Sequence, residues 1–353
     1  MMQTATGTGK GTGSGATAHA GIDATAAGSG AELALIADIG GTNARFALCD
    51  PSAAVPELLE PRSLRNAEFA SLQHAAEHYL AEVGARPRRA AIALACPVGG
   101  NEIRLTNRAW SFNRHELRAS LGLDELRLIN DFGAIAHAVP ALAEHERVVL
   151  HGQEHALEHG PISVLGPGTG FGVGLLAGSA AQGWTVVETE GGHVSFAPLG
   201  DEERALADWA IARHGRVSWE RLLSGSGLAA IDAVLREREG GPPGQMRDPA
   251  DVVAAALDGH DVIARRALAR FCAILGSVAG DVALVHGARS VVIAGGIVPR
   301  FLPFLRASAF RERFLAKGRF AAWLEPVSVQ VAIHPNPGLL GAAVALRGGE
   351  GAR

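Results

Sequence analysis

The sequence predicts an α/β protein made of two similar halves, and three observations predict it. The apolar run over residues 33–49 is broken by the turn DIGGT at 38–42. A second apolar run at 162–165 is followed by GPGTG at 166–170 and by another apolar run at 171–176. The 353 residues are 48% hydrophobic and 19% charged, which suffices for two separate cores. Two strand-turn-strand units, each heading about half of the chain, indicate a duplicated fold.

The two glycine turns have residue types that suit an anion. Glycine lets the backbone approach a ligand closely, successive amide groups point into one concavity, and a threonine hydroxyl adds a donor. The first turn taken alone is more typical of an ordinary hairpin. Its repetition favours two phosphate-binding turns that face one another across a cleft, an arrangement suited to a polyphosphate.

Composition points to a small-molecule ligand. The formal net charge of −4 offers no basic surface for nucleic acid and no polybasic segment for an anionic membrane. Cys49, Cys96 and Cys272 are far apart in the sequence and form no CxxC pair. This spacing argues against a zinc site built on thiolates and against a disulfide framework, and it fits a reducing compartment.

Two segments are excluded from targeting or membrane roles. Residues 1–30 are almost wholly Ala, Gly, Thr and Ser, and we expect them to form a disordered tail and not a signal peptide. Residues 161–187 carry no charge and are long enough to cross a bilayer. Their repeated glycines fit turns and short strands better, so no membrane span is predicted.

The first half alternates strands and helices. A polar stretch at 51–66 precedes a helix at 68–83, ended by Gly84. A buried strand at 89–96 follows, and 101–105 is expected to pair beside it. After a polar turn at 106–110, Ser111 or Asn113 caps a short helix at 114–120, and the next strand spans 126–129.

Asn130 and Asp131 follow that strand and precede a helix that runs to Val139. Ligands of open parallel sheets bind outside the carboxyl ends of the strands, so this pair points polar groups into a candidate site. Both residue types also favour the N-cap of a helix. The two interpretations are compatible if one residue caps and the other faces the ligand.

The second half contains a further polar loop and a third glycine junction. Glu190 and His193 flank two glycines, a spacing that disfavours a zinc site and leaves either a solvated loop or hydrogen bonding to a polyol. Gly295 and Gly296 follow an apolar strand at 290–294, where a nucleoside could lie against backbone or where the chain simply turns into a helix. The other predicted helices cover 201–214, 228–239, the segment opened by Pro249, 261–286 and 339–346, with a loop at 240–248 and a last strand at 327–333.

Taken together, these segments resemble the bacterial glucokinase family of the hexokinase-like, actin-fold superfamily. The resemblance covers residues 31–346 through DIGGTNAR, INDF, GPGTGFGV, EGGHVSFAP, ERLLSGSGL, IAGGIVPRF and NPGLLGAA. It implies two domains of ribonuclease H-like topology around a central cleft for ATP and sugar. The smaller domain would comprise 31–140 plus 334–353, and the larger one 141–333.

The resemblance also implies roles for individual residues. Asp131 would be the general base on the sugar 6-hydroxyl, and Mg²⁺ would be held through ATP with Asp38 in its outer shell and no direct protein ligand. The sugar hydroxyls would be held by Asn130, Asp131, Glu190, His193 and Glu220. The nucleotide would be held by Asp38, Ile39, Gly40, Gly41, Thr42, Gly168, Thr169, Gly170, Gly295 and Gly296.

The implied activity is ATP-dependent phosphorylation of glucose to glucose 6-phosphate, feeding glycolysis, by a cytoplasmic homodimer that binds neither nucleic acid nor membrane. A kinase for another hexose or for an N-acetylated sugar is the nearest alternative. A sugar-sensing regulator usually carries a helix-turn-helix, which the tail cannot form. An actin-like filament protein would not need Glu190, His193 and Glu220.

Overall fold

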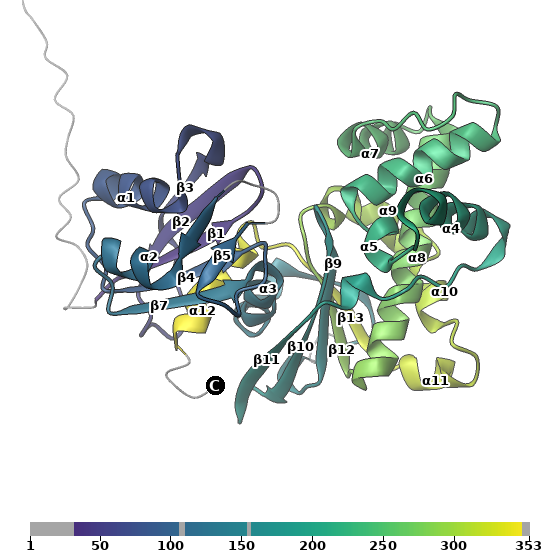
Figure 1. The fold of residues 1–353 in the computed structure, drawn as a ribbon. Helices are drawn as coiled ribbons and strands as arrows, with labels where there is room; N and C mark the ends of the chain where they lie inside the picture. Colours follow the sequence, from purple (N-terminus) through teal and green to yellow (C-terminus); the bar gives the residue numbers. More distant parts are fainter. Residues whose placement is uncertain (1–31, 106–109, 154–156, 348–353) are drawn as a thin grey trace, which may run out of the picture. The chain divides into compact units, whose positions relative to one another are not determined.

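The computed structural model describes residues 32–105, 110–153 and 157–347. The predictions for the tail at 1–30 and for most of the turn at 106–110 therefore lie outside the described residues. Two mixed sheets with the same internal order form the framework (Figure 1). The first runs β3-β2-β1-β4-β7 and the second runs β11-β10-β9-β12-β13-β8. The predicted duplicated α/β fold is confirmed at the level of topology.

In both sheets the central strand is antiparallel to the next strand of the chain and parallel to a later one. The first sheet consists of β1 (Ala34–Ile39), β2 (Asn43–Cys49), β3 (Leu59–Arg65), β4 (Arg89–Leu94) and β7 (Glu125–Asn130). The second consists of β8 (Arg147–His151), β9 (Ile162–Pro167), β10 (Phe171–Ser179), β11 (Gly183–Thr189), β12 (Ser290–Ile293) and β13 (Ser328–Ala332). The β1–β2 and β9–β10 hairpins thus hold equivalent places and carry the two glycine turns.

The faces of each sheet are covered by different helices. Alternate residues of β1 divide between two cores: Leu35 packs on the side of α1 (Leu72–Val83), and Ile36 packs on the side of α12 (Pro337–Arg347). One face of the second sheet packs on α8 (Val262–His286) and its neighbours, and the other packs on α3 (Asp131–Ala138). The remaining helices are α2 (Arg114–Ser120), α4 (Gly200–His214), α5 (Trp219–Leu222), α6 (Gly225–Arg238), α7 (Pro249–Asp258), α9 (Leu302–Ala307), α10 (Phe310–Leu315) and α11 (Ala321–Leu324).

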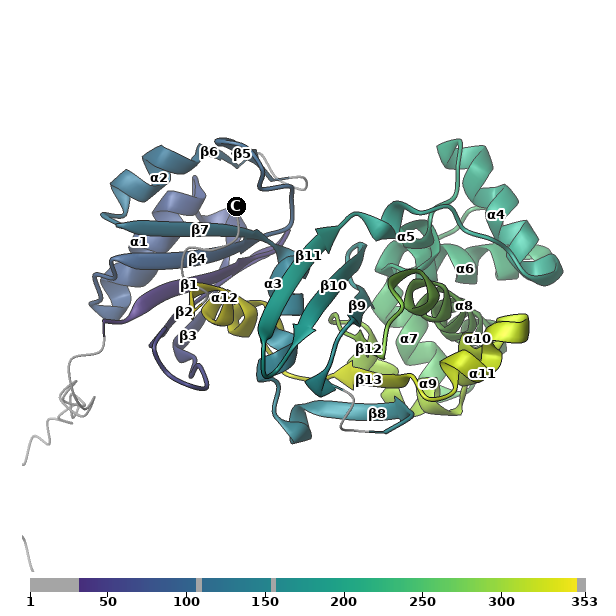
Figure 2. The same ribbon diagram turned by 90° about the horizontal axis from the view of Figure 1, so that it is seen from below.

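Helices α3 and α12 pack against each other and against both sheets (Figure 2). Ala134 belongs to the core of the first sheet, whereas Ala136 and Leu340 belong to that of the second. The crossing is close, because a Cβ at Gly341 would lie 1.6 Å from the carbonyl oxygen of Ala134. Any side chain at position 341 would collide with this carbonyl oxygen, so only glycine permits the close crossing of the two helices.

Several element predictions were wrong in detail. The segment at 101–105 does not pair with β4, because β1 and β7 already occupy both edges of β4; instead β5 (Glu102–Arg104) pairs with β6 (Ser111–Asn113). The first helix begins at Leu72 and not at residue 68, because Ser71 is its N-cap. Helix α6 begins three residues earlier than predicted, since Ser224 accepts a hydrogen bond from the Gly227 amide.

Some elements were not predicted at all. The polar stretch at 51–66 contains β3, an exposed strand whose burial pattern shows no apolar alternation. Strand β8 is half-buried throughout, and the short helices α9, α10 and α11 give too few turns for a periodic signal. By contrast, Asn113 caps α2 and Gly287 ends α8 as predicted.

Among the residues that the structure describes, one helix is long and apolar enough to span a bilayer by length and composition, namely α8. In its most apolar window 72% of the residues are buried inside the protein, as in the core helix of a globular domain. The segment at 161–187 is not a helix but forms β9, β10 and most of β11.

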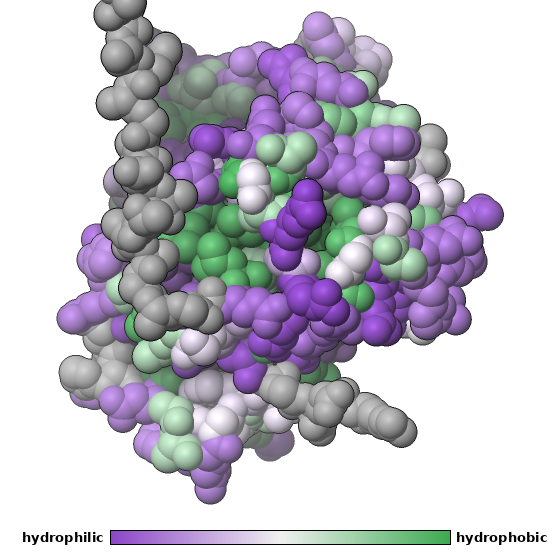
Figure 3. Space-filling model, turned by 90° about the vertical axis from the view of Figure 1, so that its left-hand side faces the viewer, coloured by the Kyte–Doolittle hydropathy of each residue, from purple (hydrophilic) through white to green (hydrophobic). Residues whose placement is uncertain are grey.

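One face of the molecule is shown in Figure 3, where polar residues surround a hydrophobic area near the centre.

We predict that Gly341→Ala destabilises the protein by about 1–3 kcal/mol or more, because the added methyl group forces α3 and α12 apart. Denaturant unfolding followed by circular dichroism measures this change. Gly99→Ala is the control, since a Cβ at Gly99 meets no atom within 4 Å. Equal stability of the two variants would contradict the close crossing.

Candidate active site

Three parallel strand ends of the first sheet bring predicted residues to one edge. Ile39 is in register with Leu94, and Leu94 is in register with Asn130. The first glycine turn and the Asn130-Asp131 pair therefore emerge at the same edge, with only β4 between them. This is the edge at which the sequence predicted a site.

Asn130 is the N-cap of α3. Its Oδ1 accepts hydrogen bonds from the amides of Phe132 at 2.9 Å and Gly133 at 3.3 Å. Its own amide donates to Oε1 of Glu188 at 3.1 Å. Asn130, the neighbour of the predicted base Asp131, is therefore the residue that caps the helix. The role of Asn130 as a sugar ligand stays a prediction.

Asp131 is the first residue of α3, and its carboxyl has a higher pKa than that of an ordinary aspartate. Burial is the main reason that the pKa of its carboxyl is raised to about 6, and the negative charges of Asp38 and Glu190 contribute in the same direction. The Phe132 amide, which donates to Asp131 Oδ1 at 2.8 Å, acts in the opposite direction. A carboxylate with a pKa just below neutrality is mostly ionised at pH 7 yet holds a proton more strongly than an ordinary aspartate, as a general base requires.

Asp38 is a second half-buried carboxyl at this edge. Burial raises its pKa, whereas Arg45, whose Nη1 lies 3.3 Å from Asp38 Oδ2, lowers it. The carboxyl also lies against the first turn of α12, where a Cβ at Gly338 would be 2.7 Å from Asp38 Cγ. The N-terminal end of a helix favours negative charge and so helps to keep this group ionised.

The first glycine turn is held by a residue that the sequence did not reveal. Asn66 is fully buried; its Nδ2 donates to the Gly40 carbonyl at 2.8 Å and its amide donates to the Thr42 carbonyl at 3.0 Å. Its Oδ1 has no hydrogen-bond partner among the described residues. Gly41 and Thr42 are exposed. No motif surrounds Asn66, so its role could be found only from the fold.

The second glycine turn lies directly against the third glycine junction. Gly295 adopts φ +98°, and a Cβ there would be 2.4 Å from the Pro167 carbonyl oxygen. The Ala294 amide donates to the Leu165 carbonyl at 2.8 Å. Thr169 and Gly296 are exposed, and Gly168 and Gly170 are partly exposed. Two of the three predicted nucleotide segments are thus neighbours in the fold.

Glu190, His193 and Glu220 come together as predicted. His193 Nε2 lies 3.9 Å from Glu190 Oε2, and His193 Nδ1 lies 4.0 Å from Glu220 Oε1. The side chains of Glu190 and His193 are 72% and 58% exposed, so they are accessible to a ligand. Arg216, which the sequence analysis missed, donates to the His193 carbonyl at 2.7 Å and to Ser195 Oγ at 3.2 Å.

The donor set fits a magnesium ion carried by nucleotide phosphates. Among the described residues, no three His, Cys, Asp or Glu side chains lie close enough together to hold a metal ion. Asp38 nevertheless places one carboxylate, a hard oxygen donor of the kind that Mg²⁺ prefers, beside the first turn. Ions held by one carboxylate plus phosphates and water need no larger protein cage.

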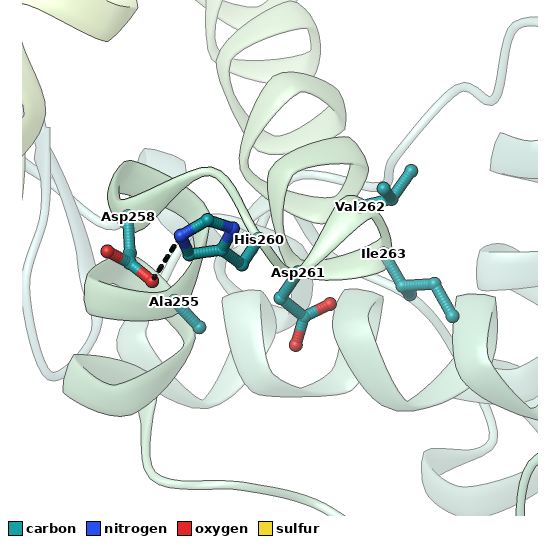
Figure 4. A pocket seen from close by; sticks show the side chains of 6 residues that line it. All are labelled: Ala255, Asp258, His260, Asp261, Val262 and Ile263. Carbon is teal, nitrogen blue, oxygen red and sulfur yellow. Dashed lines mark ion pairs between the residues drawn. The ribbon is translucent and has the colours of Figure 1, made fainter.

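A pocket at the junction of α7 and α8 is separate from these residues (Figure 4). It is lined by Ala255, Asp258, His260, Asp261, Val262 and Ile263. Asp261 is the N-cap of α8, and His260 Nε2 lies 4.0 Å from Asp258 Oδ2. The polar groups of this pocket mark helix ends and include none of the predicted site residues.

Comparisons with known proteins show which family the chain resembles. A family model described as Glucokinase matches residues 35–348. A glucokinase from Tolumonas auensis is 43% identical over 318 residues, which are 90% of this chain and 98% of that protein. A crystal structure of glucokinase from an Antarctic psychrotroph is 36% identical with a TM-score of 0.78, covering 89% of this chain and 98% of that one.

A more distant structure shares the fold. It is a ROK family glucokinase from Streptomyces griseus in complex with glucose and AMPPNP, with 19% identity and a TM-score of 0.61, covering 90% of this chain and all of that one. The family model, the curated relative and the shared topology lead to one conclusion. This chain belongs to the glucokinase family.

Proposed function

We propose that this protein transfers the γ-phosphoryl group of ATP to the 6-hydroxyl of D-glucose, forming glucose 6-phosphate and ADP, with Asp131 as general base. One observation carries the proposal. The half-buried Asp131 carboxyl, with its pKa of about 6, lies at the strand edge that also bears the first glycine turn, and the charge of Glu190 in the polar loop contributes to this raised pKa. A base, an anion turn and a polyol-binding loop are thereby combined.

In this proposal the nucleotide lies along the glycine segments. Backbone amides of the first turn, Asp38–Thr42, and of the second turn, Gly168–Gly170, hold the phosphates, and Gly295 and Gly296 line the adenosine site. Asp38 lies in the outer shell of Mg²⁺, which neutralises phosphate charge when bound. Phosphoryl transfer depends mainly on such positioning and charge stabilisation, so these backbone groups supply much of what the reaction needs.

The sugar lies against Asn130, Asp131, Glu190, His193 and Glu220. Asp131 accepts the proton of the 6-hydroxyl as the hydroxyl oxygen bonds to the γ-phosphorus and the bond from that phosphorus to the ADP oxygen breaks. A positioned base of this kind typically contributes about 10²–10⁴-fold. Asn130 fixes the start of α3 through Oδ1, and in this proposal its side-chain amide group donates to a sugar hydroxyl.

The wider setting is part of the same proposal. The domain division at 31–140 plus 334–353 and 141–333 is supported by the packing of α12 in one core with β1 and β4. A role in glycolysis and a cytoplasmic location follow from the proposed product. The proposed homodimer is a separate expectation that a measurement of mass in solution tests.

We predict that the purified protein has its highest kcat/KM with glucose among glucose, fructose, mannose and N-acetylglucosamine, each with ATP and Mg²⁺. A coupled assay for ADP measures the rates. A preference for another of these sugars would reassign the substrate, and activity on none of them would refute the proposed function.

A second prediction concerns Asp131→Asn, which keeps the shape of the side chain but cannot accept a proton. Turnover should fall by about 10²-fold or more, while glucose affinity changes less. The N-cap at Asn130 is untouched. Turnover within about threefold of the parent, with glucose binding intact, would remove the base assignment.

The same variant should be more stable than the parent at pH 8. The folded protein binds the Asp131 proton more tightly than the unfolded chain does, so parent stability falls as the pH rises from 3.8 to about 6. Asparagine avoids this loss, which is at most about 3 kcal/mol at about 1.4 kcal/mol per pH unit. Urea unfolding at pH 8 and at pH 4 measures the difference, which should be much smaller at the lower pH, where most of the loss has not yet occurred.

A further prediction concerns the pH dependence of the reaction. We expect kcat/KM for glucose to rise with pH through an apparent pKa of about 6, because the ionised form of Asp131 is the active one. Glu190→Gln should move this limb to lower pH, since the Glu190 charge raises the Asp131 pKa. Asp201→Asn, an exposed change on α4, is the control and should leave the limb in place. An unmoved limb in Glu190→Gln would contradict the electrostatic coupling.

A further inference from the structure

The two carboxylate oxygens of Glu220 face different parts of the site. Oε1 lies toward the polar loop, 4.0 Å from His193 Nδ1. Oε2 accepts a hydrogen bond from the Phe171 amide at 3.0 Å, and Phe171 is the residue directly after the second glycine turn. One side chain on the short helix α5 therefore contacts the backbone at the end of the turn and also faces the proposed sugar site.

The turn itself is shaped around this carboxylate. A Cβ at Gly170 would lie 2.4 Å from Glu220 Oε2 and 3.3 Å from its Cδ. A Cβ at Gly168, in the same turn, would meet no atom within 4 Å. Gly170 thus leaves space for Glu220, whereas Gly168 has open space around it.

Backbone contacts hold the turn at its start and across its width. The Gly168 carbonyl accepts from the Gly225 amide of α6 at 3.0 Å, and the Gly168 amide donates to the Gly170 carbonyl at 2.8 Å. At the end of the turn, the Phe171 amide donates to Glu220. Its register partner across the hairpin is Pro167. Glu220 therefore fixes the end of the turn that the helix α6 does not reach.

We infer that Glu220 is a positioning residue that couples the sugar site to the second phosphate turn, so that glucose and nucleotide each raise the affinity of the protein for the other. The inference rests on the proposed function. A sugar hydroxyl bonded to Oε1 fixes the carboxylate, and the carboxylate in turn fixes the Phe171 amide and the end of the turn. Because the coupling is a difference in binding free energy, it acts equally in both directions.

The glucose half of the test uses calorimetric titration of glucose without nucleotide. In Gly170→Ala the added methyl group displaces Glu220, so the Kd for glucose should rise about tenfold, within the usual range of coupling between sites. Gly168→Ala is the matched control and should bind glucose within about twofold of the parent, as expected for a site without a steric conflict. In the Glu220→Ala background, Gly170→Ala should cause no further loss, because the carboxylate it displaces is gone.

The nucleotide half of the test uses AMPPNP with Mg²⁺ and no sugar. Glu220→Ala removes the acceptor of the Phe171 amide, so affinity should fall about three- to tenfold, the value of one hydrogen bond. Glu220→Gln keeps an acceptor oxygen and should retain the parent affinity. Glu190→Ala alters the sugar loop without touching the turn and should also match the parent.

The outcomes separate the inference from the proposed function. If the parent binds no glucose, the proposed function fails and the inference fails with it. If the parent binds glucose but Gly170→Ala equals Gly168→Ala, or if Glu220→Ala equals Glu190→Ala in nucleotide affinity, only the coupling is overturned. Thermal unfolding confirms that each variant is folded, and should Gly170→Ala not fold, the nucleotide half decides the question.

Discussion

The backbone contact between α3 and α12 is the constraint on which the site depends. Each of these helices packs on both sheets, and Gly341 lets them meet at the carbonyl of Ala134. Since Asp131 starts α3 and Asp38 lies against the start of α12, this one crossing sets the position of both half-buried carboxyls. A wider crossing would move both carboxyl groups relative to the glycine turns of the second sheet.

The site brings together carboxyl groups whose negative charges repel one another. In addition to burial, the charges of Asp38 and Glu190 both raise the pKa of Asp131. The negative charge of Asp38 is itself offset by Arg45 and by the start of α12. Such an arrangement lowers stability, because buried like charges are costly. It also keeps the pKa of a proton acceptor near neutrality, where the acceptor can take the proton of a hydroxyl. Such an exchange of stability for activity is common in enzymes.

The sequence was sufficient for the fold class and for residues within motifs, but not for the residues that support them. The glycine turns and Asp131 stand at strand ends and could be singled out from the sequence pattern, whereas the sugar-binding roles of Glu190, His193 and Glu220 came from the family resemblance and stay predictions. Asn66 and Arg216 act through hydrogen bonds to backbone carbonyls 23 or more residues away, and no local pattern encodes such contacts. Strand β3 was missed because both of its faces are largely exposed, which removes the alternation that identifies a strand.

The two hydrogen bonds from Asn66 to the first glycine turn limit where the chain can accept insertions. The segment around it looks like an ordinary variable surface connection, yet it supplies both hydrogen bonds that fix the carbonyls of Gly40 and Thr42. Insertions are usually accepted in such connections. Here an insertion directly before Asn66, which follows the last residue of β3, would shift this asparagine and release the first turn, so any exchange of this loop must keep Asn66 in register with the β1–β2 hairpin.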